Sequence, residues 1–328
     1  MEPSNNNPDR GGQGLVQGGK EKKKEKKYYG KLLILIIFIV LSIEYYAYVF
    51  EVMLKYMTQK NFNLILTLLV IFHILVLLLL MAFISTMSTN PGEIPLYWGF
   101  YIGDEDFKRK RYCLICNAFK PERSHHCSVC NKCVLNMDHH CPWVDNCIGF
   151  YNRKYFFQLL FYTSIITIYF DLSAAYFVYQ IIMDIIYKRL KYSKIIDTGI
   201  ILVTYTFTLV FSFIITMFFK FHIGLIINNS TTIESLDKEH KEENEKFNIG
   251  YYENWIQVLG NNKCLWFIPY ECEAGRPVGD GLTWKTKNDD IGDYNNNSGP
   301  KVKSGDNQFV ELGNFASNNY TTSPISPP

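Results

Sequence analysis

Four long apolar runs dominate the pattern of hydrophobic and polar positions along the chain. They occupy residues 32–54, 62–86, 155–186 and 198–222. A helix of about 20 predominantly apolar residues crosses a hydrocarbon core of about 30 Å. The pattern therefore predicts a polytopic α-helical membrane protein with four transmembrane helices. The third run is longer than a bilayer requires, so part of it is expected to tilt or to project beyond the membrane.

Polar segments flank and separate these runs. Residues 1–31 are rich in Asn, Gly and Lys and are expected to form a disordered, basic N-terminus. Residues 87–154 hold most of the cysteines and predict a separate domain between the second and third helices. Residues 223–273 mix charged and aromatic residues, as a block lying on the membrane surface would. Gly, Asn, Ser and Pro dominate residues 274–328, which predicts a disordered tail.

Basic residues indicate the orientation of the helices. Six lysines lie within residues 20–27, directly before the first run, and residues 87–154 are also basic. Positive charge favours the cytosolic side. Both termini and residues 87–154 are therefore predicted to be cytosolic, in an endomembrane (Golgi or endoplasmic reticulum) or the plasma membrane. One short loop opposes the rule and is outweighed by the other two basic segments; it carries Lys188, Arg189, Lys191 and Lys194.

Cysteine and histidine crowd into one part of the chain. Seven of the nine cysteines lie between residues 113 and 147, interleaved with four histidines, which favours metal binding in a reducing compartment over disulfides. Two zinc ions need eight ligands, so three of the eleven candidates are spare, although spacing alone leaves shared ligation by all eleven open. The candidates are Cys113, Cys116, His125, His126, Cys127, Cys130, Cys133, His139, His140, Cys141 and Cys147.

The stretch Asp138-His139-His140-Cys141 suggests chemistry beside metal binding. In an extended segment side chains alternate, so His139 and Cys141 would share one face while His140 points to the other. A cysteine attacks as its thiolate, a neighbouring imidazole can accept the proton, and a carboxylate can orient that imidazole. One face of this segment could therefore hold a base and a nucleophile.

The position of Cys141 near the membrane indicates a class of substrate. The third apolar run begins about a dozen residues later, which holds the thiol close to the membrane surface. A long-chain acyl donor could place its chain among the helices, where about fifteen methylenes gain about 0.8 kcal/mol each. Thioester exchange is nearly balanced in free energy and needs no nucleotide. The sequence has no phosphate-binding Gly-rich loop of the P-loop or dinucleotide type.

One motif now carries a family resemblance. From Cys113 to Phe156 the chain reads C-x2-C-x3-K-P-x-R-x2-H-C-x2-C-x2-C-x4-D-H-H-C-x-W-V-x-N-C-I-G-x2-N-x3-F. This pattern resembles the DHHC cysteine-rich domain of protein S-acyltransferases (palmitoyltransferases). Blocks similar to those of the family occur at Glu44 to Val49, Thr231 to Glu234 and Asn254. Asn90 departs from the pattern, because the family usually has Asp-Pro-Gly where this chain has Asn-Pro-Gly.

The resemblance implies which candidates bind zinc. One structural zinc would take Cys113, Cys116, His126 and Cys133, and the other would take Cys127, Cys130, His140 and Cys147. His125, His139 and Cys141 are then left over. The resemblance further implies that Asp138 and His139 activate Cys141 as the catalytic nucleophile.

Other positions receive supporting roles. The resemblance implies that Thr232 supports Asp138 and that Asn254 holds the C-terminal block against the core. Lys120 and Arg123 are expected to contact the phosphates of CoA, since these are polyanionic. Trp143, two residues after the nucleophile, is expected at the membrane interface or the cavity mouth.

The predicted function is protein S-palmitoyltransferase. The expected partners are palmitoyl-CoA, substrate proteins with membrane-proximal cysteines and the lipid bilayer, and no nucleic acid. Two alternatives stay open. A membrane-anchored zinc module without catalysis would have no need of Asp138, His139 and Cys141 together, and a thiol–disulfide oxidoreductase would need its two CxxC pairs free of metal.

Overall fold

The computed structural model describes residues 12–99, 111–189 and 195–287, with side chains from Tyr29 onward. Some predicted features lie outside the described residues, namely Lys191, Lys194 and the tail from residue 288. The backbone of the lysine-rich segment 20–27 is described, but its side chains are not. The long helices are α1 (Gly12–Tyr46), which continues as the π-helix η1 (Ala47–Leu54), α2 (Phe62–Ser88), α4 (Arg153–Ile186) and α5 (Ile195–Ile227).

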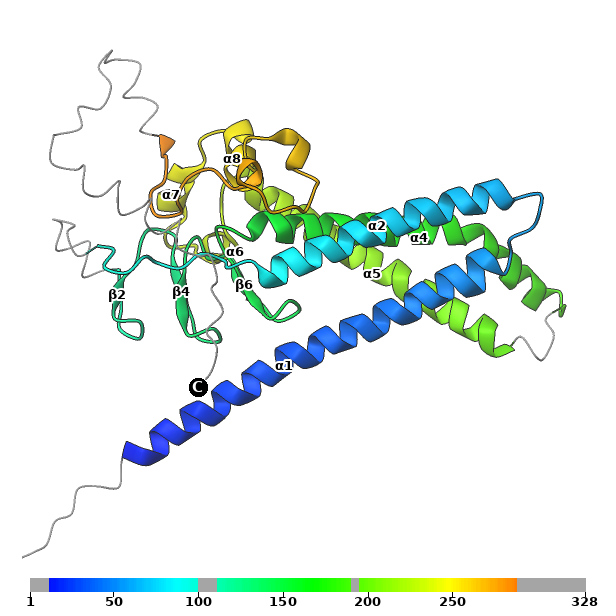
Figure 1. The fold of residues 1–328 in the computed structure, drawn as a ribbon, viewed down its shortest axis with the longest axis horizontal. Coiled ribbons are helices and arrows are strands. Elements are labelled where there is room, and N and C mark those ends of the chain that lie inside the picture. The colour runs from blue at the N-terminus through cyan, green and yellow to red at the C-terminus, as the bar shows by residue number, and fades with distance from the viewer. Residues whose placement is uncertain (1–11, 100–110, 190–194, 288–328) are drawn as a thin grey trace, which may run out of the picture. The chain divides into compact units, whose positions relative to one another are not determined.

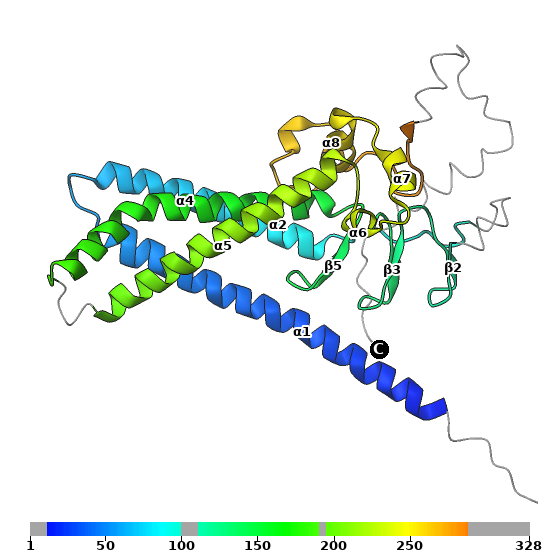
Figure 2. The same ribbon diagram turned by 180° about the vertical axis from the view of Figure 1, so that it is seen from behind.

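Four spans long and apolar enough to cross a membrane are present, as predicted: Tyr29–Leu54, Phe62–Ser88, Arg153–Ile186 and Ile195–Ile227. Helices α2 and α5 both pack along α4 (Figures 1 and 2). The π-helix closes the bundle at the end away from the strands by contacting α2, α4 and α5. Its buried side chains belong to an aromatic and aliphatic core that includes Tyr48, Phe72 and Phe170.

The first helix differs from the prediction in two ways. It begins at Gly12, whereas composition predicted disorder up to residue 31. Lys and Glu, which fill residues 20–27, are good helix formers, so the apolar helix extends backwards through them. The π-helix was not predicted, because apolar residues surround it and no periodicity distinguishes i→i+5 from i→i+4 bonding there.

A polar contact joins two helices inside the bundle. The Thr208 hydroxyl on α5 donates to Glu44 Oε2 on α1 at 3.0 Å. A hydrogen bond of this kind stabilises a polar group that would otherwise meet hydrocarbon.

Three short antiparallel hairpins form between α2 and α4, side by side near the end of α2 (Figure 1). They are β1 (Tyr112–Cys113) with β2 (Ala118–Phe119), β3 (His125–Cys127) with β4 (Lys132–Val134), and β5 (His139–Cys141) with β6 (Asn146–Ile148). Each turn contains a residue with positive φ, namely Asn117, Asn131 and Asp145. Asn and Asp tolerate this left-handed conformation better than other side chains.

The C-terminal block follows α5 as a series of short helices. They are α6 (Thr232–Leu236), α7 (Lys241–Asn244), η3 (Glu245–Phe247), α8 (Tyr251–Leu259), η4 (Lys263–Leu265) and η5 (Glu273–Gly275). Residues 274–285, predicted as part of a disordered tail, instead pack on the preceding part of the chain. Lys154 Nζ donates to Gly275 O at 2.8 Å, and Val278 N donates to Gln257 O at 3.1 Å. A Gly-rich segment can follow a surface closely without secondary structure of its own, and composition does not reveal such packing.

Candidate metal centres and active site

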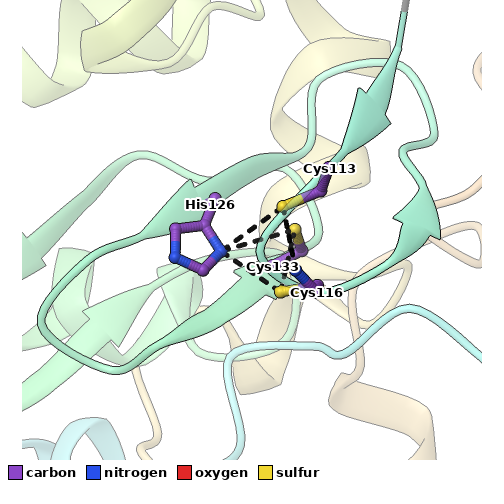
Figure 3. A group of neighbouring side chains, drawn as sticks. All are labelled: Cys113, Cys116, His126 and Cys133. Atoms are coloured by element: carbon purple, nitrogen blue, oxygen red, sulfur yellow. Dashed lines mark hydrogen bonds between the residues drawn. The ribbon is translucent and has the colours of Figure 1, made fainter. Parts of the chain in front are cut away.

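The first metal centre joins two consecutive hairpins. Cys113 and Cys116 come from the first hairpin, and His126 and Cys133 are directly opposite each other in the second. Figure 3 shows His126 Nδ1 directed toward the three sulfur atoms, at 3.6 Å from Cys113, 3.2 Å from Cys116 and 3.9 Å from Cys133. All four ligand atoms lie within 4.8 Å of one another.

The second centre repeats this arrangement one hairpin further along. Cys127 and Cys130 come from the second hairpin, and the opposed pair His140 and Cys147 comes from the third. Cys130 Sγ lies 3.4 Å from both His140 Nδ1 and Cys147 Sγ. A tetrahedron with zinc–ligand distances of about 2.0–2.3 Å has edges of roughly 3.3–3.8 Å. The Cys3His donor sets and their spacing therefore fit zinc, and the pairing equals the predicted one.

The three spare candidates lie outside both centres. In β5 the extended backbone sends His140 to the second metal centre while His139 turns the other way, as the alternation predicted. His139 Nδ1 lies 2.7 Å from Asp138 Oδ2. The same strand carries Cys141 on the side of His139, and this residue is 5% exposed. The predicted Asp-His-Cys set is thus assembled within four consecutive residues.

Asp138 is fully buried and makes several polar contacts. Its Oδ1 accepts a hydrogen bond from Thr232 N, and its Oδ2 accepts one from the Thr232 hydroxyl, each at 2.8 Å. Arg153 Nη2 lies 3.9 Å from Oδ1. Burial alone would raise the pKa of Asp138, but the hydrogen bond to His139 and the charge of Arg153 hold that pKa well below its ordinary value. Asp138 is therefore ionised and fixed in place beside the His139 ring.

The His139 ring lies between this carboxylate and the thiol. Burial would lower its pKa, yet contacts with Asp138 and Cys141 raise the pKa of His139 to about 9. With Nδ1 turned to Asp138, the opposite nitrogen, Nε2, remains for the thiol. Phe156 packs edge-on against the His139 ring, with ring centroids 5.1 Å apart. The imidazole is consequently held in one orientation.

Apolar side chains surround the Cys141 thiol. It belongs to a buried cluster with Phe83, Val144, Ile148, Phe156 and Leu160, against which Ile34, Ile37, Ile215 and Phe219 pack. These residues come from α1, α2, α4 and α5 as well as the third hairpin. The Cys141 side chain therefore faces the interior of the four-helix bundle, at the end near the hairpins, rather than open solvent.

Sequence reasoning missed one residue beside this site. His222 on α5 is 4% exposed, and its Nε2 has no hydrogen-bond partner among the residues that the structure describes. Its ring centroid lies 6.1 Å from that of His139 and 5.1 Å from that of Phe156. A single histidine in an apolar run was the only available signal, and nothing in the pattern ties it to residue 139.

The other predicted residues occupy different environments. Thr232 contacts Asp138, and Asn254 is buried and donates to Ile227 O at 2.7 Å, at the end of α5. Trp143 lies in the turn of the third hairpin with 54% of its surface exposed. Asn90 Oδ1 accepts from Gly92 N at 3.0 Å, so the replacement of Asp by Asn keeps the turn.

Lys120 and Arg123, the two residues expected at the CoA phosphates, differ in burial and in hydrogen-bond partners. Arg123 is 3% exposed, and its guanidinium pairs with Glu234 at 2.7 Å, so the expectation for Arg123 is corrected: its donors are already used inside the protein. Lys120 is half-buried and has no carboxylate partner within the described residues. Lys120 N donates to Arg111 O at 2.6 Å, and burial together with the charges of Arg111 and Lys120 lowers the pKa of His125. Arg111 Nε is buried without a hydrogen-bond partner among the described residues.

Comparison with known proteins agrees with this geometry. A family model described as DHHC palmitoyltransferase matches residues 106–239. Probable protein S-acyltransferase 14 of Arabidopsis thaliana is 33% identical over 280 residues, which cover 76% of this chain and 88% of the relative. The chain belongs to the DHHC palmitoyltransferase family.

Further relatives of this DHHC protein come from plants and fungi. Probable protein S-acyltransferase 13 of Arabidopsis thaliana is 31% identical over 241 residues, 66% of this chain and 78% of the relative. Palmitoyltransferase pfa3 of Schizosaccharomyces pombe is 35% identical over 201 residues, 59% of this chain and 57% of the relative. The resemblance inferred from the motif is thereby confirmed, as is a multi-pass membrane protein with two Cys/His metal centres between α2 and α4.

Proposed function

We propose that this DHHC protein transfers a long-chain acyl group from acyl-CoA, through a thioester on Cys141, to cysteine thiols of other proteins. The observation that carries the proposal is an Asp138–His139–Cys141 set that stands apart from two complete Cys3His metal centres. The family and its relatives, named protein S-acyltransferases and palmitoyltransferases, support the same reaction class.

The first step acylates the enzyme. His139 Nε2 accepts the proton of Cys141 Sγ, and the thiolate attacks the carbonyl carbon of the acyl-CoA thioester. A sulfur–carbon bond to Cys141 forms, the bond to the CoA sulfur breaks, and the departing CoA thiolate receives the proton from His139. Asp138 stays ionised and holds the imidazolium in place.

The second step repeats this chemistry with a protein thiol. The incoming thiol loses its proton to His139, attacks the Cys141 acyl thioester, and displaces the Cys141 thiolate, which recovers the proton. One thioester replaces another in each step, so no further reactant is required. Zinc, when bound, fastens adjacent hairpins together and so fixes the β5 strand that carries the reacting residues.

The surroundings of Cys141 support a long acyl chain. The apolar cluster around the thiol opens toward side chains of all four spans, including Ile37 and Ile215. Each methylene transferred from water to such an environment contributes about 0.8 kcal/mol. A long chain among the helices would bind well and leave its thioester at the thiol.

Two basic side chains are suited to the CoA phosphates. Lys120 has no carboxylate partner within the described residues, and Arg111 lies opposite it, with Lys120 N donating to Arg111 O at 2.6 Å. Charge-assisted hydrogen bonds from such groups hold phosphate oxygens strongly. Arg123 is not among them, because Glu234 already occupies it.

The orientation follows from the same chemistry. Acyl-CoA and reduced zinc thiolates occur in the cytosol, which supports a cytosolic location for the hairpins and both termini, with the protein in an endomembrane or the plasma membrane. Trp143 in the turn after Cys141 would then lie at the membrane interface. Substrate cysteines must reach a thiol held at this level, which favours membrane-proximal cysteines.

Thioester labelling tests the proposal. Purified full-length protein incubated with labelled palmitoyl-CoA should acquire hydroxylamine-sensitive label, and Cys141→Ser should acquire none while keeping about two zinc ions per chain. Label in the serine variant equal to that of the unchanged protein would overturn the proposal. Absence of label in both, with zinc present, would favour the non-catalytic zinc module instead.

A further inference from the structure

The Arg123 guanidinium is enclosed between two aromatic rings from the C-terminal block. Its Cζ lies 4.5 Å from the ring centroid of Phe247 and 4.4 Å from that of Trp284. A buried guanidinium over the face of Trp is among the stronger cation–π contacts. Trp284 therefore covers a charge that is 3% exposed and more than 150 residues away in the chain.

Arg123 also forms an ion pair with Glu234 in α6, the helix whose first residue contacts Asp138. Arg123 Nε and Nη2 donate to the two carboxylate oxygens of Glu234 at 2.7 and 2.8 Å. Glu234 closes a capping box with Thr231, which begins α6: Thr231 N donates to Glu234 Oε2 at 2.9 Å. The first residue of that helix, Thr232, holds Asp138 by both its N–H and its hydroxyl.

We propose that Trp284 is a positioning residue for acyl transfer, which acts through Arg123 and Glu234 to hold Thr232 against Asp138. The inference rests on the proposed function, since it needs Asp138 to orient His139. It assigns the segment around Trp284 to the catalytic machinery, although this segment touches none of the reacting atoms.

The segment is anchored well enough to act in this way. Val278 N donates to Gln257 O at 3.1 Å, and the Trp284 ring meets Phe150 edge-on with centroids 5.7 Å apart. A Cβ at Gly281 would lie 2.9 Å from Phe150 Cγ, so the backbone approaches this ring as closely as only glycine allows. Phe150 lies in the short connection between β6 and α4, which ties the segment to the third hairpin.

The contacts of Trp284 suggest a matched control variant for testing its role. Its Nε1 is buried and has no hydrogen-bond partner among the described residues, so the ring contributes by stacking rather than by donating. Trp284→Phe keeps an aromatic face over Arg123, whereas Trp284→Ala removes it. The two variants therefore separate loss of the stack from loss of the indole.

Single-turnover acylation of Cys141 by labelled palmitoyl-CoA tests the inference on full-length protein. We expect Trp284→Ala to lower the rate constant roughly threefold to thirtyfold, the span of cation–π energies from exposed to desolvated sites, and Trp284→Phe to stay within about twofold of the unchanged protein. The KM for palmitoyl-CoA and the zinc content should stay unchanged in both.

A double-mutant cycle separates positioning from general loss of structure. If Trp284 acts through Thr232, Trp284→Ala should lower the rate by a smaller factor in a Thr232→Val background, where only the backbone N–H of residue 232 still holds Asp138. Additive losses, an unchanged rate in Trp284→Ala, or a parallel loss of zinc would each overturn the inference while leaving the proposed function intact. Absence of a Cys141 thioester in the unchanged protein would instead overturn both.

Discussion

Thr232 binds Asp138 at two points, through its backbone N–H and its hydroxyl, each at 2.8 Å, although the two residues are 94 positions apart. The carboxylate that orients His139 is thus held by a helix beyond the last transmembrane span. The proposed reacting set, which lies in β5 and directly before it, depends on a distant segment for its geometry.

Removing the Thr232 hydroxyl should weaken acylation of Cys141. Thr232→Val keeps the shape and the backbone N–H but deletes the hydrogen bond to Oδ2, which is worth about 1.5–3 kcal/mol when the acceptor is charged. We expect about a tenfold or larger fall in the single-turnover rate constant. Thr232→Ser, which keeps the hydroxyl, should retain most of the rate, and equal losses in both variants would argue against this role.

The His139–Asp138 pair should make stability pH-dependent on the alkaline side. The pKa of His139 is raised from 6.5 to about 9 in the folded protein. A raised pKa stabilises the folded state fully below pH 6.5, and this contribution, at most about 3 kcal/mol, is lost as the pH rises to 9. Thermal unfolding of the zinc-loaded protein between these pH values should show the fall, and Asp138→Asn should flatten it. An equal slope in the variant would contradict the assigned cause.

Zinc removal should abolish acylation because the hairpins lose their cross-links. The unchanged protein should contain about two zinc ions, and a strong chelator should remove both together with the labelling. Cys130→Ser should lose the zinc next to His140 and the labelling with it. Cys264→Ser, an exposed cysteine outside both centres, is the control and should change neither quantity. Full occupancy would also exclude the thiol–disulfide oxidoreductase alternative.

Asn254 should be a determinant of the stability of the C-terminal block. It is fully buried, its Nδ2 donates to Ile227 O and Asn248 Oδ1, and its Oδ1 accepts from Ile249 N. Asn254→Ala leaves these groups unpaired and should lower the free energy of unfolding by about 1–3 kcal/mol per buried group left unsatisfied. Limited proteolysis after residue 227 measures the effect. Asn261→Ala, at an exposed position, should have none.

Replacing Lys120 should affect the KM for palmitoyl-CoA, whereas replacing Arg123 should affect the stability of the fold. Lys120→Ala should raise the KM for palmitoyl-CoA several-fold at unchanged zinc content, because a phosphate contact would be lost. Arg123→Ala leaves Glu234 buried without its partner and should instead destabilise the fold by about 3–5 kcal/mol. A higher KM in Lys120→Ala should also become less evident at high salt, where the charge is screened.

Local pattern was sufficient for much of this protein. The four spans follow from apolar runs, since a bilayer requires a length that few soluble helices show. Alternation in an extended strand separated His139 from His140. Local pattern was not sufficient for the two metal centres, because counting ligands shows that three of the eleven Cys and His candidates are free but not which three. Family resemblance supplied the pairing, and the structure explains it: each CxxC turn joins a His–Cys pair that is opposed across the next hairpin.

The sequence by itself determined the membrane spans, the number of metal ligands and the reacting motif, because each depends on residues close together in the chain. Only the tertiary structure decided the partners of Asp138, the burial of Arg123 and the packing of Trp284. Those contacts join segments about 90 to 160 residues apart, and no local periodicity encodes which buried charge meets which ring or hydroxyl. The packing of the C-terminal block against the hairpins makes that choice.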